Sequence, residues 1–235
     1  MNEVKLSKRL QAVAEEIIPQ SVLADIGSDH AYLPCYCVLH NRIVSAIAGE
    51  VVEGPYQSAK TTVEQLHLED KISVRKGDGL SVLAGGEADV ITICGMGGAL
   101  IRDILERGKG KLQGVQRLVL QPNIGAHNIR QWLIENGWEL KKEQILKEDG
   151  KIYEILCAEK GNPMQPYGEQ ETAGVLMGPF LLPEKSTVFV EKWQHELKSL
   201  KMIYEQLNKA AETEETERKR QELLEKIALI EEALG

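Results

Sequence analysis

The run Asp25-Ile26-Gly27-Ser28-Asp29-His30 places two carboxylates around a glycine, directly after an apolar segment. In an open α/β sheet, ligands bind beyond the carboxyl ends of the strands, so such a turn is a candidate nucleotide site. A dinucleotide site has the pattern GxGxxG, in which backbone N–H groups meet a pyrophosphate. Here Asp29 stands where the second glycine would be, and its charge would repel a pyrophosphate. The carboxylates instead favour S-adenosylmethionine, which carries a sulfonium and an ammonium. A simpler role for Asp29, compatible with the first, is to cap the following helix.

Three further groups of this kind follow later predicted strands. Glu50 can accept hydrogen bonds from both hydroxyls of a ribose. Asp78, between two glycines, can accept a hydrogen bond from an adenine amino group, and the Gly-Met-Gly-Gly run at 95–98 lets a ligand approach the backbone. Each group alone is also compatible with an ordinary turn, but their order at consecutive strand ends predicts one donor site. The predicted donor-binding residues are Asp25, Gly27, Ser28, Asp29, Glu50, Asp78, Gly79, Gly95, Met96 and Gln121.

Amide side chains follow the fifth predicted strand in the run Gln121-Pro122-Asn123. They would lie on the rim of the site, where a substrate base could enter, although an ordinary proline turn is an equal alternative. His30 is the only histidine in these strand-end turns, and the other histidines are scattered along the sequence. We therefore expect no metal site.

The elements that position these turns follow from apolar periodicity. Apolar residues between Leu6 and Ile18 recur at helical spacing, and Pro19 ends that helix. Strand-like segments then alternate with helical ones, and two adjacent strands around the turn Asp149-Gly150 come last. This order predicts a Rossmann-like α/β domain with a mostly parallel, seven-stranded sheet and one antiparallel strand. The predicted strands are Val22–Gly27, Val44–Gly49, Ile72–Asp78, Ala88–Cys94, Leu118–Gln121, Trp138–Leu146 and Lys151–Ala158, and the predicted helices between them are Pro55–Leu68, Gly98–Glu106 and Ala126–Asn136.

The C-terminal part has a different pattern. Residues 161–183 are rich in proline and glycine and are predicted as a linker between a domain at 1–160 and a helical part at 184–235. Within that helical part, apolar residues show coiled-coil spacing before and after a polar gap at 212–217. We predict an antiparallel helical hairpin, with one continuous helix that pairs with another chain as the alternative. The seam residues are Trp193, Leu197, Leu200, Tyr204, Leu207 and Ala211, followed by Leu223, Leu224, Ile227, Ile230 and Leu234.

Composition limits the class of protein. The 235 residues are 43% hydrophobic and 27% charged, which is typical of a globular chain. No apolar run approaches the roughly 20 residues of a membrane span, and the charged start lacks a signal sequence, so no membrane partner is expected. The four cysteines lack redox or zinc spacing, which favours a reducing cytoplasm. The net charge of −8 argues against a surface that binds nucleic acid everywhere, but it allows a local basic patch.

Five runs together resemble the bacterial tRNA (adenine-22-N1)-methyltransferase family, the TrmK family. They are LADIGSDHAYLP from Leu23, GDGL from Gly77, ICGMGG from Ile93, LQPN from Leu120 and DGKIYE from Asp149. The resemblance covers roughly residues 3–160, and the family also carries a C-terminal helical hairpin. It implies a class I methyltransferase fold and methyl transfer from S-adenosylmethionine to N1 of an adenine in the tRNA D-arm. The family lacks the Asn-Pro-Pro-Tyr run of enzymes that methylate the exocyclic N6 amine, which disfavours that reaction.

The expected reaction, together with the positions of residues along the sequence, suggests roles on the acceptor side. Adenine N1 has a free lone pair and can attack the methyl group directly, so alignment matters more than a strong base. N1 lies on the Watson–Crick edge, so the base must first be exposed. We expect Asp29, His30 and Asn123 to orient the base or donor, and Tyr32 or Tyr153 to stack on it.

Cations are needed to bind tRNA phosphates, although each group of them is equally compatible with a solvated face. The predicted contacts are Lys5, Lys8, Arg9, Arg107, Lys109 and Lys111, with Arg102, Lys141 and Lys142 as further candidates. A monomer is favoured. The rival readings are a methyltransferase for a small molecule or a protein, and a non-catalytic binding module.

Overall fold

A computed structural model of the chain describes residues 5–209 and 213–235. The chain divides into two compact units, Met1–Pro166 and Tyr167–Gly235, which we call the N-terminal and C-terminal units. Each is described by itself. Within the described ranges, no helix is long and apolar enough to cross a membrane.

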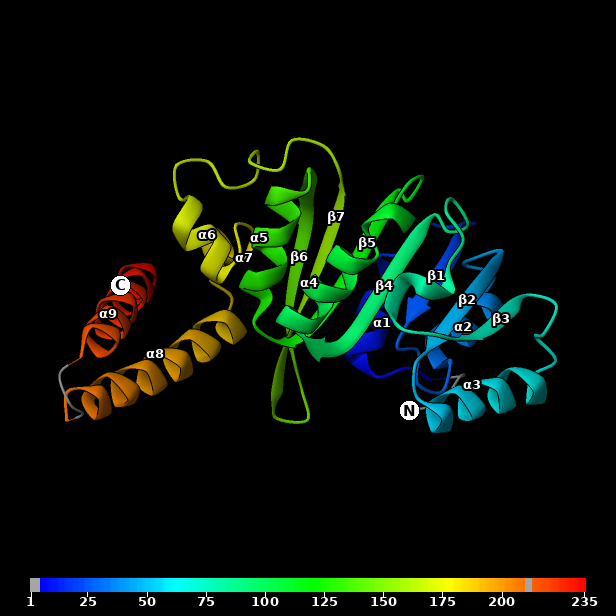
Figure 1. The fold of residues 1–235 in the computed structure, drawn as a ribbon, viewed down its shortest axis with the longest axis horizontal. Coiled ribbons are helices and arrows are strands. Elements are labelled where there is room, and N and C mark those ends of the chain that lie inside the picture. The colour runs from blue at the N-terminus through cyan, green and yellow to red at the C-terminus, as the bar shows by residue number, and fades with distance from the viewer. Residues whose placement is uncertain (1–4, 210–212) are drawn as a thin grey trace. The chain divides into compact units, whose positions relative to one another are not determined.

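The N-terminal unit is built on one seven-stranded sheet of order β3-β2-β1-β4-β5-β7-β6 (Figure 1). The strands β1 to β5 are parallel, and β7 runs antiparallel between β5 and β6. The predicted fold class, a mostly parallel seven-stranded sheet of the Rossmann-like methyltransferase type, is confirmed. The strands are β1 Val22–Ile26, β2 Ser45–Glu50, β3 Ile72–Lys76, β4 Val90–Gly97, β5 Arg117–Ile124, β6 Trp138–Glu148 and β7 Lys151–Lys160.

Helices cover both faces of this sheet and create two apolar cores. One core joins sheet residues such as Ala24 to α4 and α5, and the other joins sheet residues such as Leu23 to α1, α2 and α3. Neighbouring residues of β1 thus point to opposite cores, as the alternation of a strand requires. The helices of this unit are α1 Lys8–Glu15, α2 Tyr32–Leu39, α3 Glu53–Gln65, α4 Gly98–Arg107 and α5 Ala126–Glu135, with short 3-10 turns η1 Gly79–Val82 and η2 Lys109–Lys111.

The structure differs from the sequence prediction around the first crossover. The helix α2 was not delimited from the sequence, and its residues from Leu33 to Cys35 are all buried. Its N-cap is Ala31, which has a left-handed backbone and no side-chain cap, so the alternative role of Asp29 as a helix cap is wrong. The strands β4 and β5 also run beyond their predicted ends, to Gly97 and Ile124.

The C-terminal unit contains the predicted helical hairpin. Its long helices are α8 Thr187–Leu207 and α9 Glu214–Leu234, joined by a 2.6 Å ion pair between Lys201 and Glu231. Along the predicted seam, Trp193 and Ile230 are buried, whereas Leu224 is exposed. Ala211 lies outside the described residues. The segment predicted as a linker holds two short helices, α6 Glu171–Met177 and α7 Leu181–Glu184, because its apolar residues Met177, Leu181 and Leu182 are buried.

Candidate functional site

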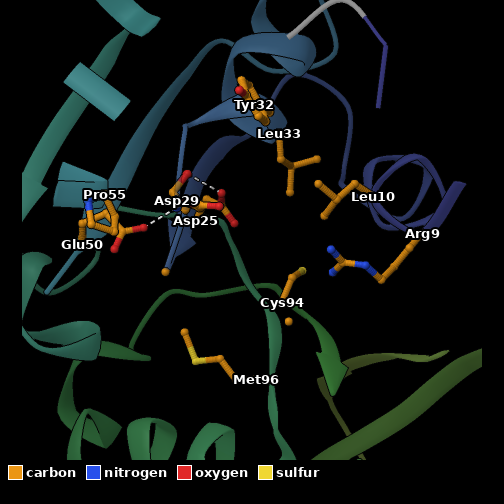
Figure 2. Close-up of a pocket in the computed structure, with 13 residues that line it drawn as sticks. Arg9, Leu10, Asp25, Asp29, Tyr32, Leu33, Glu50, Pro55, Cys94 and Met96 are labelled. Carbon is orange, nitrogen blue, oxygen red and sulfur yellow. Dashed lines mark hydrogen bonds between the residues drawn. The ribbon is translucent and has the colours of Figure 1, made fainter. Parts of the chain in front are cut away.

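A cleft of about 400 Å³ opens at the carboxyl ends of β1, β2 and β4 (Figure 2). Seven of the ten predicted donor-binding residues line it, namely Asp25, Gly27, Ser28, Asp29, Glu50, Gly95 and Met96. The predicted residues Tyr32 and Arg9 also line it. The remaining lining residues, which the sequence did not single out, are Leu10, Leu33, Pro55 and Cys94.

Gly27 shapes the floor of the cleft. Its backbone is left-handed, with φ at +74°, and its N–H donates to the carbonyl of Gly49 at 2.9 Å. A Cβ atom at this position would overlap the methyl group of Met96. The left-handed backbone therefore favours glycine, whereas the Met96 methyl group, at the end of a flexible side chain, could move aside. The turn brings the chain close to the tip of β4.

Asp25 is a buried carboxylate at the end of β1. Its two oxygens accept hydrogen bonds from the hydroxyl of Ser28 at 2.5 Å and of Thr92 at 2.6 Å. Burial raises the pKa of Asp25, although these bonds and the nearby charge of Arg9 oppose the rise. Thr92 was missed from the sequence, where the only sign was a hydroxyl within an otherwise apolar strand.

Glu50, at the end of β2, is also buried. One of its carboxylate oxygens accepts a hydrogen bond from the backbone N–H of Asp29. Burial raises the pKa of Glu50, and the neighbouring charges of Asp25 and Asp29 raise it further against the effect of that hydrogen bond. The cleft wall thus holds two buried acids that are expensive to ionise in the absence of a cationic ligand.

The side chain of Asp29 lines the cleft, and His30 contacts two of the lining residues, Asp29 and Tyr32. The Asp29 side chain is 68% exposed, and its carboxylate is 3.8 Å from the imidazole of His30. That imidazole stacks on the ring of Tyr32, with 5.0 Å between the ring centres. Asp29 and His30, which were predicted to orient the base, and Tyr32, which was predicted to stack on it, therefore form one group.

Arg9 enters the cleft from α1 and extends toward Cys94 (Figure 2). Its guanidinium donates to the side-chain oxygen of Gln121 and lies 5.3 Å from the ring centre of Tyr153. The same Gln121 oxygen accepts the N–H of Gly95 at 3.1 Å. The sequence grouped Arg9 with cations that contact phosphates from outside, but in the structure it faces the cleft.

Gln121 and Asn123 support the tip of β4. Gln121 is fully buried and holds Arg9 and Gly95, as described above. Asn123 is exposed, and its side-chain amide donates to the carbonyl of Gly95 at 2.7 Å. These two amides therefore fix the backbone of a cleft residue from both sides.

Asp78 and Gly79 line a separate hollow of about 350 Å³ rather than this cleft. Arg107 and Lys111 line the same hollow, and the Arg107 guanidinium is 3.4 Å from both carboxylate oxygens of Asp78. Both side chains of this pair are more than half exposed. The structure thus does not bring Asp78 together with Asp25 and Glu50.

Most of the other predicted phosphate contacts are bonded within the protein. Lys109 binds Glu106 at 2.8 Å and Lys142 binds Glu16 at 2.6 Å, while Lys141 and Arg102 pair with Glu139 and Asp103. Lys5 is exposed. Among the residues that the structure describes, no group of His, Cys, Asp or Glu could hold a metal ion.

Comparisons with known proteins agree on one family. A family model described as tRNA (adenine(22)-N(1))-methyltransferase matches residues 23–232. A Bacillus subtilis protein of that name is 55% identical over 235 residues, which is 100% of this chain and 99% of the relative. The crystal structure of the B. subtilis M1A22 tRNA methyltransferase TrmK has a TM-score of 0.96 and 54% identity, and the match covers 99% of this chain and 100% of that one.

A second solved structure was described with its ligand. It is a putative tRNA (m1A22) methyltransferase, Sp1610 of Streptococcus pneumoniae, in complex with S-adenosyl-L-methionine. Its identity to this chain is 46% and its TM-score is 0.86, over 98% of this chain and 100% of that one.

Proposed function

The chain belongs to the tRNA (adenine(22)-N(1))-methyltransferase family, and from this premise we propose how its cleft carries out the reaction. The enzyme transfers a methyl group from S-adenosylmethionine to N1 of adenine 22 in tRNA. The observation that carries the assignment of the cleft is the pair of buried carboxylates, Asp25 and Glu50, whose bonded donors in the described structure are neutral hydroxyl and N–H groups. A ligand with a positive charge near Asp25 and hydroxyl donors near Glu50 would satisfy both carboxylates.

The donor's charged groups match the cleft from end to end. The carboxylate of Asp25 lies where it can attract the donor's ammonium or sulfonium, and Glu50 accepts hydrogen bonds from the ribose hydroxyls. Arg9 is the only cationic side chain among the described residues that line the cleft, so it takes the donor's carboxylate. Gln121 acts indirectly, because it is buried and bonded to Arg9 and Gly95.

The adenine end of the donor extends to the hollow at Asp78. There the carboxylate of Asp78 accepts a hydrogen bond from the adenine amino group, and Gly79 leaves room beside it. The present partner of Asp78 is Arg107 at 3.4 Å, and such a long, exposed ion pair is weak enough to exchange for the donor. Arg107 then faces outward with Lys111, where both can meet a tRNA phosphate.

The acceptor base enters at the mouth, beside His30, Tyr32 and Asn123. The N1 lone pair forms the new bond to the methyl carbon as the carbon–sulfur bond breaks, which leaves a neutral thioether and a cationic 1-methyladenine. No proton is removed at N1, so none of these residues has to act as a strong base. The exposed Asp29 carboxylate lies where it can stabilise the positive charge that develops on the base.

Binding of the tRNA body requires the remaining cations. Lys5, Lys8, Lys109 and Lys111 are candidates on the N-terminal unit, and Tyr153 is a further candidate for base contact. Lys109 would have to exchange its bond with Glu106 for a phosphate. We further propose a monomeric enzyme, as expected from the sequence, and a cytoplasmic location, which the free thiols of the four cysteines, all within the described ranges, fit.

Glu50→Gln tests the donor site. Loss of an ionised acceptor is expected to raise the Kd for S-adenosylmethionine about 10- to 100-fold, measured by calorimetry, since hydrogen bonds to charged groups contribute about 1.5–3 kcal/mol. Asp78→Asn should have a smaller effect, because Asp78 is exposed. Glu64→Gln on α3, which removes an exposed acid paired with Lys60 at 3.7 Å, is the control and should bind normally.

The reaction itself is tested with labelled donor and unmodified bulk tRNA. We expect incorporation of the label as 1-methyladenosine at position 22. Donor binding without transfer to tRNA would point instead to a methyltransferase for a small molecule or a protein. A wild-type chain that binds no donor would support the non-catalytic reading, and normal binding by Glu50→Gln would refute the assignment of the cleft.

A further inference from the structure

The tip of the β6–β7 hairpin contacts the first turn of α1. The carboxylate of Glu148, the last residue of β6, accepts the backbone N–H of Lys8 at 2.6 Å and of Arg9 at 3.3 Å. The next N–H, that of Leu10, is bonded to the hydroxyl of the N-cap residue Ser7 at 3.2 Å. The first N–H groups of a helix have no partner within the helix, and a negative charge there is favoured by the helix dipole. Glu148 is therefore a cap supplied from a distant part of the chain.

The same hairpin holds α1 at a second place. Tyr153 on β7, which pairs with Leu146 across the hairpin, lies under the guanidinium of Arg9. The backbone of Arg9 is thus fixed by β6 and its side chain by β7. Since α1 has only eight residues, it is too short to be stable by itself, and these contacts set its position.

The position of α1 matters because its Arg9 brings a positive charge into a cleft that otherwise presents acids. The guanidinium donates a hydrogen bond to Gln121, and its charge acts on Asp25. A displacement of the first turn would carry the guanidinium away from both residues. The hairpin lies outside the cleft, and Glu148 does not line it.

We propose that Glu148 is a positioning residue for methyl-donor binding, which acts by fixing the first turn of α1 so that Arg9 meets the donor's carboxylate. This inference rests on the proposed donor site. A cap with a merely structural role would lower stability, and its loss would weaken donor binding by the same factor whether or not Arg9 is present.

A double-mutant cycle separates these two roles. The variants are Glu148→Gln, Arg9→Ala and the two combined, and the measurements are the Kd for S-adenosylmethionine by calorimetry and the melting temperature. Glu148→Gln should raise the Kd about threefold to tenfold through the loss of the charged cap, and Arg9→Ala about tenfold or more through the loss of the ion pair. The combined variant should bind no more weakly than Arg9→Ala alone. At saturating donor, kcat of Glu148→Gln on tRNA should stay near the wild-type value.

Two further variants serve as controls. Glu148→Asp keeps the charge on a shorter side chain and should recover part of the affinity. Glu15→Gln removes an exposed acid from the other end of α1 and should leave the Kd unchanged.

The inference is overturned if Glu148→Gln binds the donor as the wild type does, or if the two substitutions weaken binding independently. Either result would leave the proposed function standing, provided that the wild-type chain binds the donor and methylates tRNA. Failure of the wild type to bind the donor would remove the proposed function itself.

Discussion

Two pairs of buried carboxylates in the N-terminal unit differ in the charge of the groups that bind them. Glu143 and Glu154, on the β6–β7 hairpin, share the fully buried guanidinium of Arg130, at 2.7 and 2.8 Å. Asp25 and Glu50, in the cleft, receive neutral hydrogen-bond donors, and the pKa of each is raised by burial.

We infer that this difference separates structural acids from functional ones. A buried carboxylate with a buried guanidinium has its charge compensated within the fold and helps to hold a hairpin onto its neighbouring helix. A buried carboxylate without a buried cation is costly in the free protein, and the cost is recovered when a ligand supplies a positive charge or further hydrogen-bond donors. Burial alone would not have distinguished the two pairs, whereas the charge of the partner does.

The largest effect is expected from Arg130→Met. The substitution leaves two buried carboxylates without their cation, so the free energy of unfolding should fall by about 3–5 kcal/mol in denaturant titrations. The control is Arg102→Met, which removes an exposed guanidinium paired with Asp103 and should have a far smaller effect. A loss below about 1 kcal/mol for Arg130→Met would mean that this pair does not depend on its cation, and the comparison would fail.

Asp25→Asn should weaken donor binding without lowering the free energy of unfolding. The Kd for the donor should rise about tenfold or more, because an ionised partner of a cation is lost. The free energy of unfolding at neutral pH should change little or rise, because a carboxylate that is costly to bury is gone. A large loss of stability with unchanged donor binding would place Asp25 among the structural acids.

The pH dependence of the same variant sharpens this test. With a raised pKa, Asp25 gains its proton at a higher pH than an ordinary carboxyl group, so donor affinity should decline on acidification earlier than an ordinary carboxyl group would cause. The stability of the free protein should change with pH in the opposite direction. The contribution of Asp25 to stability is greatest below its unfolded pKa and is lost as the pH rises through its folded pKa. Both dependences should flatten in Asp25→Asn, measured by calorimetry and by unfolding at several pH values.

The smallest effect on stability is expected for a carboxylate that is paired with a cation but only partly buried. Glu87 binds Arg75 through two bonds of 2.6 and 2.7 Å, and this pairing lowers the pKa of Glu87 to about 2. Because both side chains are partly exposed, Glu87→Gln should lower the free energy of unfolding at pH 7 by only about 0.5–1 kcal/mol. With a lowered pKa, this contribution is present above the ordinary carboxyl pKa and is lost as the pH falls through the folded pKa of about 2. A difference from wild type that does not shrink as the pH is lowered would contradict the ionic origin.

Apolar periodicity predicted the sheet and most helices, but it missed α2 for a physical reason. A helix between a sheet and two other helices is apolar on every side, so it shows no alternation of polar and apolar faces. Helices α6 and α7 were missed because proline and glycine indicated a linker, whereas burial of Met177 and Leu181 decides their structure. The extra residues of β4 and β5 follow from pairing with each other, which a single strand does not reveal.

The candidate site was predictable where function depends on strand ends. Asp25 and Glu50 lie at the carboxyl ends of β1 and β2, and Asp29 lies shortly after β1, so their meeting follows from the topology. Arg9 was not placed correctly, because its location depends on the packing of α1 against a hairpin more than a hundred residues later. Asp78 was expected beside the others, but the structure gives it a hollow of its own with Arg107.

The place of β7 in the sheet has a consequence for synthesis of the chain. β7 is made last of the seven strands, yet it lies between β5 and β6. Until Lys160 has left the ribosome, β5 therefore presents a bare edge with unpaired backbone groups, which is the kind of edge that associates with other chains. The arrival of β7 closes that edge and delivers Tyr153 to Arg9 at the same moment. A nascent chain thus cannot place Arg9 against Tyr153 before its sheet is sealed.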